Sequence, residues 1–426
     1  MSANLIVVGL DIGTSKVCAV AAELNDRGVN ILGVGEAPSY GIRKGIVINM
    51  DATIDSIKKA VTDAETSAGI RIKSVTAGIS GVHINGLDSY GAVGIRSKEV
   101  QPPDMGRAIE SAKAIYIPLD REVLHVIPTE FLLDGQEGII DPVGMAGVRL
   151  EAKVHIITCN ASSVQNLMKC CEKAGVDVGH IVFAPIASAG ATLSRDEMEC
   201  GVVLADIGGG TTDMVFIKGG AVRHASVLGV GGAHVTNDIA VGLRINVQEA
   251  EKLKRSYGAA YAGMVNGKDE VQINQAGGNT KTIPAKYISE IIQPRSEEMI
   301  GMIKEEIKKC YGYELATCGL VLTGGASLLK GFDKMAESLL GLPVRIGQPV
   351  NIKGQMAAVK NPAYSTGAGL VTYGGDASAG RVSHADVFAD LVAGVKGWFK
   401  GAFGNNGQIQ QNKRKEGGMV CLKSRK

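Results

Sequence analysis

Residues 201–213 read GVVLADIGGGTTD, a short apolar run that ends in an acidic, glycine-rich turn. A run of this kind, bounded by a turn, is typical of a buried strand. Residues 5–16 read LIVVGLDIGTSK and repeat the pattern, with Asp11 standing about 195 positions before Asp206. After each turn the chain returns to an apolar run. A single repeat at this distance predicts two α/β halves built in a similar way, because a solenoid would repeat more often and at shorter intervals.

Other segments show the spacing of helices. Apolar residues recur on one face at 51–69, 162–174 and 285–310, which predicts three helices. We expect Asp51 to cap the first helix, and Pro294 to kink or split the third. The alternation of strands and helices is that of an α/β protein.

The predicted fold class is α/β, with two lobes built from duplicated α/β halves and an inserted α+β subdomain. The insertion is placed where Gly, Pro and short β-like runs follow the first strands and their helix, and residues 374–385 lose periodicity like a linker. The expected parts are a first half at 1–83, 161–200 and 356–380, the inserted subdomain at 84–160, a second-half core at 201–244 and 312–355, a helical lobe at 245–311, a linker at 381–386, an amphipathic helix at 387–403 and a basic, disordered tail at 404–426.

Charge and composition exclude several kinds of protein. The chain has 45 Lys and Arg against 43 Asp and Glu, and this net charge of +2 does not favour nucleic acid as a partner. From residue 381 onward nine Lys and Arg stand against three Asp and Glu, which favours an anionic surface such as lipid headgroups. No stretch reaches about 18 consecutive apolar residues, and residues 1–6 do not resemble a signal peptide. We therefore expect neither a spanning helix nor secretion.

The cysteines and two histidines suggest structural roles. Eight cysteines occur without CxxC or other metal-ligand spacing, so we expect reduced, buried thiols in a cytosolic protein. His125 and His155 lie in apolar β-like runs without a suitably spaced Cys, His or Asp, and they are predicted to be structural.

Three glycine turns, each after a strand, predict a split nucleotide site. Glycine lets backbone N–H groups approach phosphate oxygens, and hydroxyl and ammonium groups add donors and charge. We expect Asp11 and Asp206 to face each other and to hold Mg²⁺ through water. The turns lead back into strands, so they match neither a Walker A loop nor a Rossmann fingerprint. The residues expected at the nucleotide are Asp11, Gly13, Thr14, Ser15 and Lys16 of the first turn, Asp206, Gly208, Gly209, Gly210, Thr211, Thr212 and Asp213 of the second, and Gly324, Gly325 and Ala326 of the third.

This set of turns resembles that of the superfamily of actin, heat-shock chaperones and sugar kinases. The resemblance implies an actin-like ATPase fold whose halves clamp ATP and Mg²⁺ between two phosphate hairpins, with an adenosine turn as the third contact. Glu251 and Lys254, on the helical run 247–257, match the segment that holds ribose and adenine in chaperone-like members, and Gly232 joins the site by resemblance. The alternative for the Glu–Lys pair is an ordinary exposed helix face.

Within that superfamily the chain is similar to the FtsA family of bacterial cell-division proteins. The similarity rests on LHVIPTEF at 124–131, DPVGMAGVRLEAKVH at 141–155, GGAHVTNDIA at 231–240 and IIQPR at 291–295. It implies head-to-tail self-assembly, and partners that are the C-terminal peptide of FtsZ, an anionic membrane surface and downstream divisome proteins. It also implies a peripheral location on the cytoplasmic side of the cell membrane, at the division septum.

The same resemblance places the FtsZ-binding surface in the helical lobe. Lys286, Arg295 and Lys304 are the candidate cations for acidic residues of the peptide. The alternative is that these charges are only solvated helix surface.

One position bears on hydrolysis. Related chaperones carry Glu, and actin carries Gln, before the proline that matches Pro185, and this side chain positions the attacking water. Here the residue is Ala184, which can neither donate nor accept a hydrogen bond. We therefore expect at most weak ATPase activity and assign no catalytic residue.

Residues 387–403, VFADLVAGVKGWFKGAF, have helical spacing and one apolar face. About 17 residues are too few to span a bilayer, but aromatic and lysine side chains suit a helix that lies in the membrane interface. A helix docked on the core is the alternative; the preceding linker, the single Trp and the basic surroundings favour the membrane. The residues expected in the membrane are Phe388, Leu391, Val392, Val395, Trp398, Phe399 and Phe403.

Three other functions remain possible on these residues. A sugar-kinase-type phosphotransferase would need a base such as Asp213, but no sugar-binding signature is present. A chaperone would need more than the roughly 50 residues that follow the nucleotide core. An actin-like type IV pilus assembly protein would share the turns, and is expected to lack the amphipathic tail.

Overall fold

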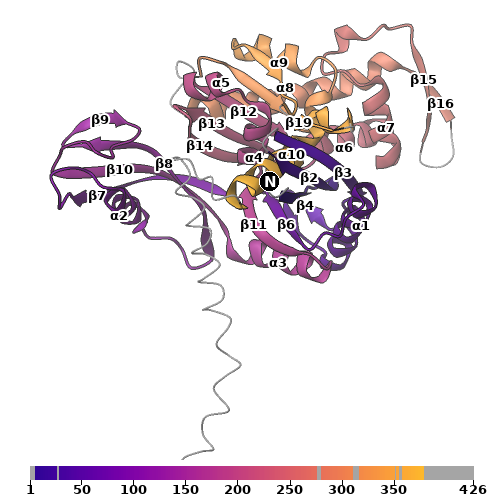
Figure 1. Cartoon of the computed structure of the whole chain (residues 1–426). Helices are drawn as coiled ribbons and strands as arrows, with labels where there is room; N and C mark the ends of the chain where they lie inside the picture. The colour runs from indigo at the N-terminus through magenta and orange to yellow at the C-terminus, as the bar shows by residue number, and fades with distance from the viewer. Residues whose placement is uncertain are drawn as a thin grey trace, which may run out of the picture. The chain divides into compact units, whose positions relative to one another are not determined.

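The part of the chain that the computed structural model describes comprises residues 5–25, 28–275, 280–309, 316–350, 352–354 and 357–378. Figure 1 labels most of its helices and strands. The first sheet runs, in spatial order, β11 (Asp177–Phe183), β6 (Ser74–Ile79), β1 (Leu5–Ile12), β2 (Lys16–Asn25), β3 (Gly28–Pro38) and β19 (Ile352–Lys353).

The second sheet repeats the topology of the first. It runs, in spatial order, β14 (Ala221–Leu228), β13 (Thr212–Lys218), β12 (Val202–Ile207), β17 (Leu320–Thr323) and β18 (Val344–Ile346). β12 pairs antiparallel with β13 and parallel with β17, as β1 does with β2 and β6. The order β3-β2-β1-β6-β11 therefore matches β14-β13-β12-β17-β18, and the predicted duplication of two α/β halves is confirmed.

Helices cover both faces of the first sheet. Side chains of a strand alternate between its faces, so each strand packs on helices on both sides. Val8, Leu10 and Ile12 of β1 share one buried cluster with residues of α1 and α3. Val7 belongs to the opposite cluster, with residues of α10. The helices packed around this sheet are α1 (Met50–Ala68), α3 (Ala161–Lys173), α4 (Ala184–Thr192) and α10 (Ser365–Ser378), whereas the short α5 (Arg195–Cys200) contacts β13 of the second sheet.

The core of the second half lies between its sheet and four helices. Val203 and Ile207 of β12 are buried in one cluster with Ile239, Ile288 and Phe332 from three of these helices. Each such side chain contributes about 1.5–3 kcal/mol by burial. The helices are α6 (Gly232–Leu243), α7 (Val247–Tyr257), α8 (Ala285–Lys309) and α9 (Phe332–Leu340), and the small hairpins of the fold are β15 (Glu270–Asn274) with β16 (Thr280–Pro284) and β4 (Ile42–Arg43) with β5 (Ile46–Val47).

An inserted subdomain follows β6. Its sheet runs β7 (Asn85–Gly94), β10 (Arg149–Asn160), β8 (Arg121–Leu133) and β9 (Gln136–Ile139), and α2 (Pro102–Lys113) packs on this sheet. Figure 1 shows it as a sheet of its own, apart from the two central ones. β14 of the second half contacts β7, β8 and β10, so the insertion touches both halves.

Two local expectations are wrong, and a third is narrowed. Asn49, and not Asp51, caps α1, because the Asn49 side chain accepts a backbone N–H of the first turn at 3.0 Å. α8 continues through Pro294 as one helix, so Pro294 does not split it, and the alternative of a kink stays a prediction. α10 continues to Ser378, and the linker therefore does not begin at residue 374.

The three C-terminal parts predicted at 381–386, 387–403 and 404–426 lie outside the described residues. Within the described ranges, no helix is both long enough and apolar enough to cross a membrane.

Candidate functional site

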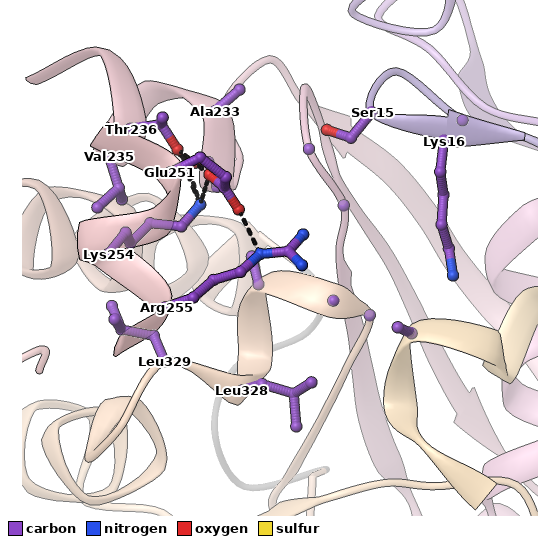
Figure 2. Close-up of a pocket in the computed structure, with 18 of the residues that line it drawn as sticks. Ser15, Lys16, Ala233, Val235, Thr236, Glu251, Lys254, Arg255, Leu328 and Leu329 are labelled. Atoms are coloured by element: carbon purple, nitrogen blue, oxygen red, sulfur yellow. Dashed lines mark hydrogen bonds and ion pairs between the residues drawn. The ribbon is translucent and has the colours of Figure 1, made fainter. Parts of the chain in front are cut away.

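A cleft of about 1480 Å³ lies where the carboxyl ends of β1 and β12 approach each other. Its walls come from the turns after β1, β12 and β17, from α6 and from α7. All the residues predicted at the nucleotide line this cleft except Gly210 and Thr212. Figure 2 shows Glu251, Lys254 and Arg255 on one wall, and Ser15 and Lys16 across from them.

The turns at 13–16 and 208–211, which we call the phosphate turns after their predicted role, have the same backbone hydrogen bond. The N–H of Gly13 donates to the carbonyl of Lys16 at 3.0 Å, and the N–H of Gly208 donates to the carbonyl of Thr211 at 2.9 Å. Each bond closes a tight turn between antiparallel strands. The repeat seen in the sequence thus extends to individual atoms.

The turns of the two halves touch each other. A Cβ atom at Gly209 would overlap the hydroxyl of Ser15, and one at Gly210 would lie 2.7 Å from Oγ1 of Thr14. Because glycine has no Cβ, the second turn can approach the first this closely. The contact brings the two turns to one place in the cleft.

Three carboxyl groups gather beside these turns. Burial raises the pKa of Asp11 to about 7, with the charge of Asp206 adding to the rise and Lys16 opposing it. Burial also raises the pKa of Asp213 to about 7, and that of Asp206 above its usual range. Desolvated carboxylates that repel one another are stabilised by a cation placed among them.

The donor set fits a hydrated Mg²⁺ ion. Asp11 and Asp206 offer hard oxygen ligands, which Mg²⁺ prefers while it keeps several waters. Across the described residues, no group of three or more His, Cys, Asp or Glu is placed to hold a metal ion. Asp11 and Asp206 would hold such an ion through its coordinated waters.

Hydroxyl groups that the sequence analysis missed hold two of these carboxylates. Ser188 and Thr366 donate to Asp206 at 2.5 and 3.0 Å. Ser80 lies 2.6 Å from both oxygens of Asp213. These hydroxyls come from α4, α10 and the end of β6, so no local pattern could have placed them beside the turns.

Thr212 does not act as predicted. Its hydroxyl donates to the carbonyl of Val230 at 2.9 Å, and the side chain is fully buried. Successive residues point to opposite sides of an extended chain, so Thr211 and Asp213 line the cleft while Thr212 points away from it. Gly210 likewise lies outside the cleft, against Thr14.

The wall opposite the phosphate turns carries Glu251 and Lys254. The ammonium of Lys254 lies 2.6 Å from Glu251, and it donates to Oγ1 of Thr236 at 2.8 Å and to the carbonyl of Gly232 at 3.1 Å. Burial lowers the pKa of Lys254, with Glu251 opposing the change. Burial would raise the pKa of Glu251, but Lys254, together with hydrogen bonds from Thr236 and Arg255, outweighs burial and holds that pKa below its usual range. The pair lines the cleft and is tied to α6.

The third turn closes the same wall. Gly324 follows β17 with φ of 83°, a conformation that favours glycine. A Cβ atom there would collide with Oδ1 of Asp206. Ala326 approaches Gly232 at the start of α6, since a Cβ at Gly232 would lie 2.8 Å from that of Ala326. All three predicted turns thus meet in one cleft.

Lys16 is held at the edge of the cleft by two residues that were not predicted. Its ammonium lies 3.1 Å from Glu36 and 3.7 Å from the centre of the Tyr364 ring. The hydroxyl of Tyr364 donates to Glu36 at 2.7 Å. The arrangement keeps the Lys16 charge beside the phosphate turns.

Ala184 lies in the cleft, as its proposed relation to hydrolysis requires. The backbone N–H of the preceding Phe183 donates to Nε2 of His125 at 2.9 Å. Burial lowers the pKa of His125 to about 4, so the ring is neutral. His125 therefore supports the segment that leads to Ala184, in agreement with its predicted structural role.

The three candidate partner cations differ in their surroundings. Arg295 donates to Asp238 at 2.7 and 3.1 Å and also pairs with Glu298. Lys304 donates to the carbonyl of Leu339 at 2.8 Å, at the end of α9. Lys286 is exposed, 4.0 Å from Glu290.

Two sheets of one topology, with facing phosphate turns in the cleft between them, define an actin-like protein. Solved structures share this fold. One is a PilM–PilN type IV pilus biogenesis complex, with a TM-score of 0.64 and 18% identity over 87% of this chain and 99% of that one. Another is MreB5 of Spiroplasma citri bound to ADP, with a TM-score of 0.54 and 16% identity over 88% of this chain and 98% of that one.

Sequence comparison identifies the family. The model "Cell division protein FtsA" matches residues 203–369, and "SHS2 domain inserted in FTSA" matches residues 81–158. Cell division protein FtsA of Pseudomonas aeruginosa is 40% identical over 93% of this chain and 98% of its own length. That of Escherichia coli K12 is 38% identical, over 93% and 96%. The chain belongs to the FtsA family of cell division proteins.

Proposed function

We propose that this protein binds ATP with Mg²⁺, polymerises, and ties FtsZ to the inner face of the cytoplasmic membrane at the septum. The observation that carries the nucleotide part is the contact between the turns at Ser15 and Gly209, which brings the two turns together beside three buried carboxyl groups. Titration calorimetry with Mg²⁺–ATP tests it directly, and Gly209→Val is the sharpest variant.

Each wall of the cleft has its own part in the binding. The N–H groups of the two turns and Lys16 would hold the phosphates. Asp11 and Asp206 would hold the water shell of Mg²⁺, and the ion would neutralise phosphate charge. Glu251 and Lys254 would meet the ribose and adenine, because they line the opposite wall beside the third turn.

Hydrolysis is expected to be slow, with steady turnover below about 1 s⁻¹, a rate that ordinary enzymes exceed. Ala184 presents only a methyl group to the cleft, and loss of a group that orients water costs roughly 10²-fold or more. Phosphate release by purified protein, with and without anionic vesicles, measures the rate. Ala184→Glu is expected to raise it, provided that Mg²⁺–ATP affinity shows an intact cleft. Fast turnover of the unchanged chain would contradict the role given to Ala184.

Filaments are expected on anionic lipid monolayers with ATP. The inserted subdomain offers exposed apolar side chains at Ile140 and Val148, and such side chains favour association. Ile140→Glu with Val148→Glu is expected to abolish filaments in electron micrographs while Mg²⁺–ATP affinity stays unchanged. Filaments that persist in this variant would move the contact elsewhere, and only dispersed molecules of the unchanged chain would rule polymerisation out.

Membrane attachment is assigned to residues 387–403 and FtsZ binding to the helical lobe. The support is the apolar face of the segment in the sequence and membership of the family. Lys286 is the exposed candidate for an acidic peptide, whereas Arg295 and Lys304 would first have to leave intramolecular partners. Downstream divisome proteins would then gather on the assembled polymer.

A further inference from the structure

Two free cysteines lie side by side at the edge of the second sheet. Cys200 ends α5 and is exposed, whereas Cys318 precedes β17 and is half-buried. The parallel pairing of β12 with β17 brings them together, because Val203 stands opposite Leu320. Two residues earlier on each strand, the N–H of Cys318 donates to the carbonyl of Gly201 at 2.9 Å. Neither cysteine lines the nucleotide cleft.

Further contacts hold the segments that carry the two cysteines close to each other. The hydroxyl of Thr317 donates to the carbonyl of Cys200 at 2.5 Å, which ties the two segments a second time. Cys200 is also among the neighbours that raise the pKa of Cys318. Gly201 stands opposite Cys318, so Cys200 is offset from Cys318 by one residue. Neighbouring strands lie about 4.8 Å apart and successive Cα atoms about 3.8 Å, which places the two cysteines near the range of about 4.4–6.8 Å between Cα atoms that disulfides span. A bond between these two sulfur atoms therefore needs no large backbone movement.

We propose that Cys200 and Cys318 form a redox-sensitive pair, which a small-molecule disulfide converts to a disulfide bond. The thiolate of Cys200 attacks one sulfur of the reagent, forms a mixed disulfide and releases the first reagent thiol. Cys318 then loses its proton and attacks the sulfur of Cys200, which releases the second reagent thiol. Two protein thiols are oxidised, one reagent disulfide is reduced, and the two protons leave on the released thiols.

The surroundings of the pair favour this order of steps. Burial raises the pKa of Cys318, and the neighbouring Cys200, Glu197 and Asp196 add to the rise. Cys318 is therefore protonated at neutral pH, and the exposed Cys200 meets the reagent first. The two carboxylates favour a cationic reagent over an anionic one. The charge of Arg345, whose Nε lies 2.7 Å from Oε1 of Glu197, partly offsets the charge of Glu197.

The other cysteines set the background. Four are buried, three in the first half and one in the insertion, and burial raises the pKa of each of them, so we expect them to resist the reagent. Cys310 and Cys421 lie outside the described residues. Replacing both by Ser removes them from competition in the full chain.

The test treats the folded full chain with cystamine, a cationic disulfide, in the Cys310→Ser, Cys421→Ser background and in the unchanged chain. After removal of the reagent and denaturation, the number of free thiols is expected to fall by two in the Cys310→Ser, Cys421→Ser background. In the unchanged chain, where Cys310 and Cys421 can also react, only the peptide map is read. Peptide mapping should find Cys200 joined to Cys318. In a Cys318→Ser variant, cysteamine should remain attached to Cys200, because no second thiol displaces it.

Several outcomes would contradict the proposal of a redox-sensitive pair. They are a lasting cysteamine adduct on Cys200 when Cys318 is present, a linkage of Cys318 to Cys310 in the unchanged chain, and no loss of thiols. Circular dichroism of the Cys318→Ser variant checks its fold. The peptide map of the unchanged chain tests the pair even if that variant does not fold, because it needs no substitution. Mg²⁺–ATP affinity of the oxidised protein should stay unchanged, because neither cysteine lines the cleft.

Discussion

Gly209→Val is expected to lower the affinity for Mg²⁺–ATP by about 100-fold or more. The valine side chain would occupy the space of the Ser15 hydroxyl and push the two phosphate turns apart. Backbone hydrogen bonds to a charged phosphate contribute about 1.5–3 kcal/mol each. Each 1.4 kcal/mol changes affinity tenfold, so the loss of two such bonds is sufficient. Titration calorimetry on the purified full chain measures the effect.

Gly106→Val is the matched control. Gly106 lies in α2 of the inserted subdomain, where a Cβ atom meets no other atom within 4 Å. The same glycine-to-valine change there should leave Mg²⁺–ATP affinity unaltered, while both variants keep the circular dichroism spectrum of the parent. If Gly209→Val bound the nucleotide with unchanged affinity, the site would have to lie away from these turns.

The second large effect concerns the membrane. Trp398→Glu together with Phe399→Glu is expected to reduce binding to anionic vesicles by about 100-fold. Each inserted apolar side chain contributes about 1 kcal/mol or more, and each Lys near the surface about 1 kcal/mol. The double change removes two apolar contacts and adds two negative charges that the lipid repels. Flotation with phosphatidylglycerol vesicles, at low protein concentration, measures the bound fraction.

Gln408→Glu together with Gln410→Glu controls for charge, because it adds the same two charges outside the apolar face. This variant should float with the vesicles. A labelled C-terminal peptide of FtsZ in the same tubes should float with the parent and the control, and stay behind with the Trp398, Phe399 variant. If the Trp398→Glu, Phe399→Glu variant floated with the vesicles, residues 387–403 would not be the membrane anchor. Flotation of the parent without the peptide would refute the FtsZ contact and leave the anchor standing.

The duplicated halves were predictable because strand, turn and returning strand are encoded by neighbouring residues. The runs before Asp11 and Asp206 are apolar, and each glycine follows its aspartate at the same spacing. The structure repeats both the strand order and the hydrogen bond that closes each turn. Helix caps are also encoded by neighbouring residues. Asn49 and Asp51, however, stand only two positions apart, and only the backbone geometry shows which of them caps α1.

The choice among hydroxyl groups at the carboxylates was not predictable. Thr212 is part of the turn motif, but its side chain points to the opposite face from Thr211 and bonds Val230. Ser80 belongs to no motif, yet it lies 2.6 Å from Asp213, which is 133 positions away in the chain. Neighbours along the sequence set the shape of a turn, whereas partners of a buried carboxylate depend on how separate segments pack. Ser80 and Asp213 meet because the end of β6 and the start of β13, which belong to different sheets, lie at the same cleft.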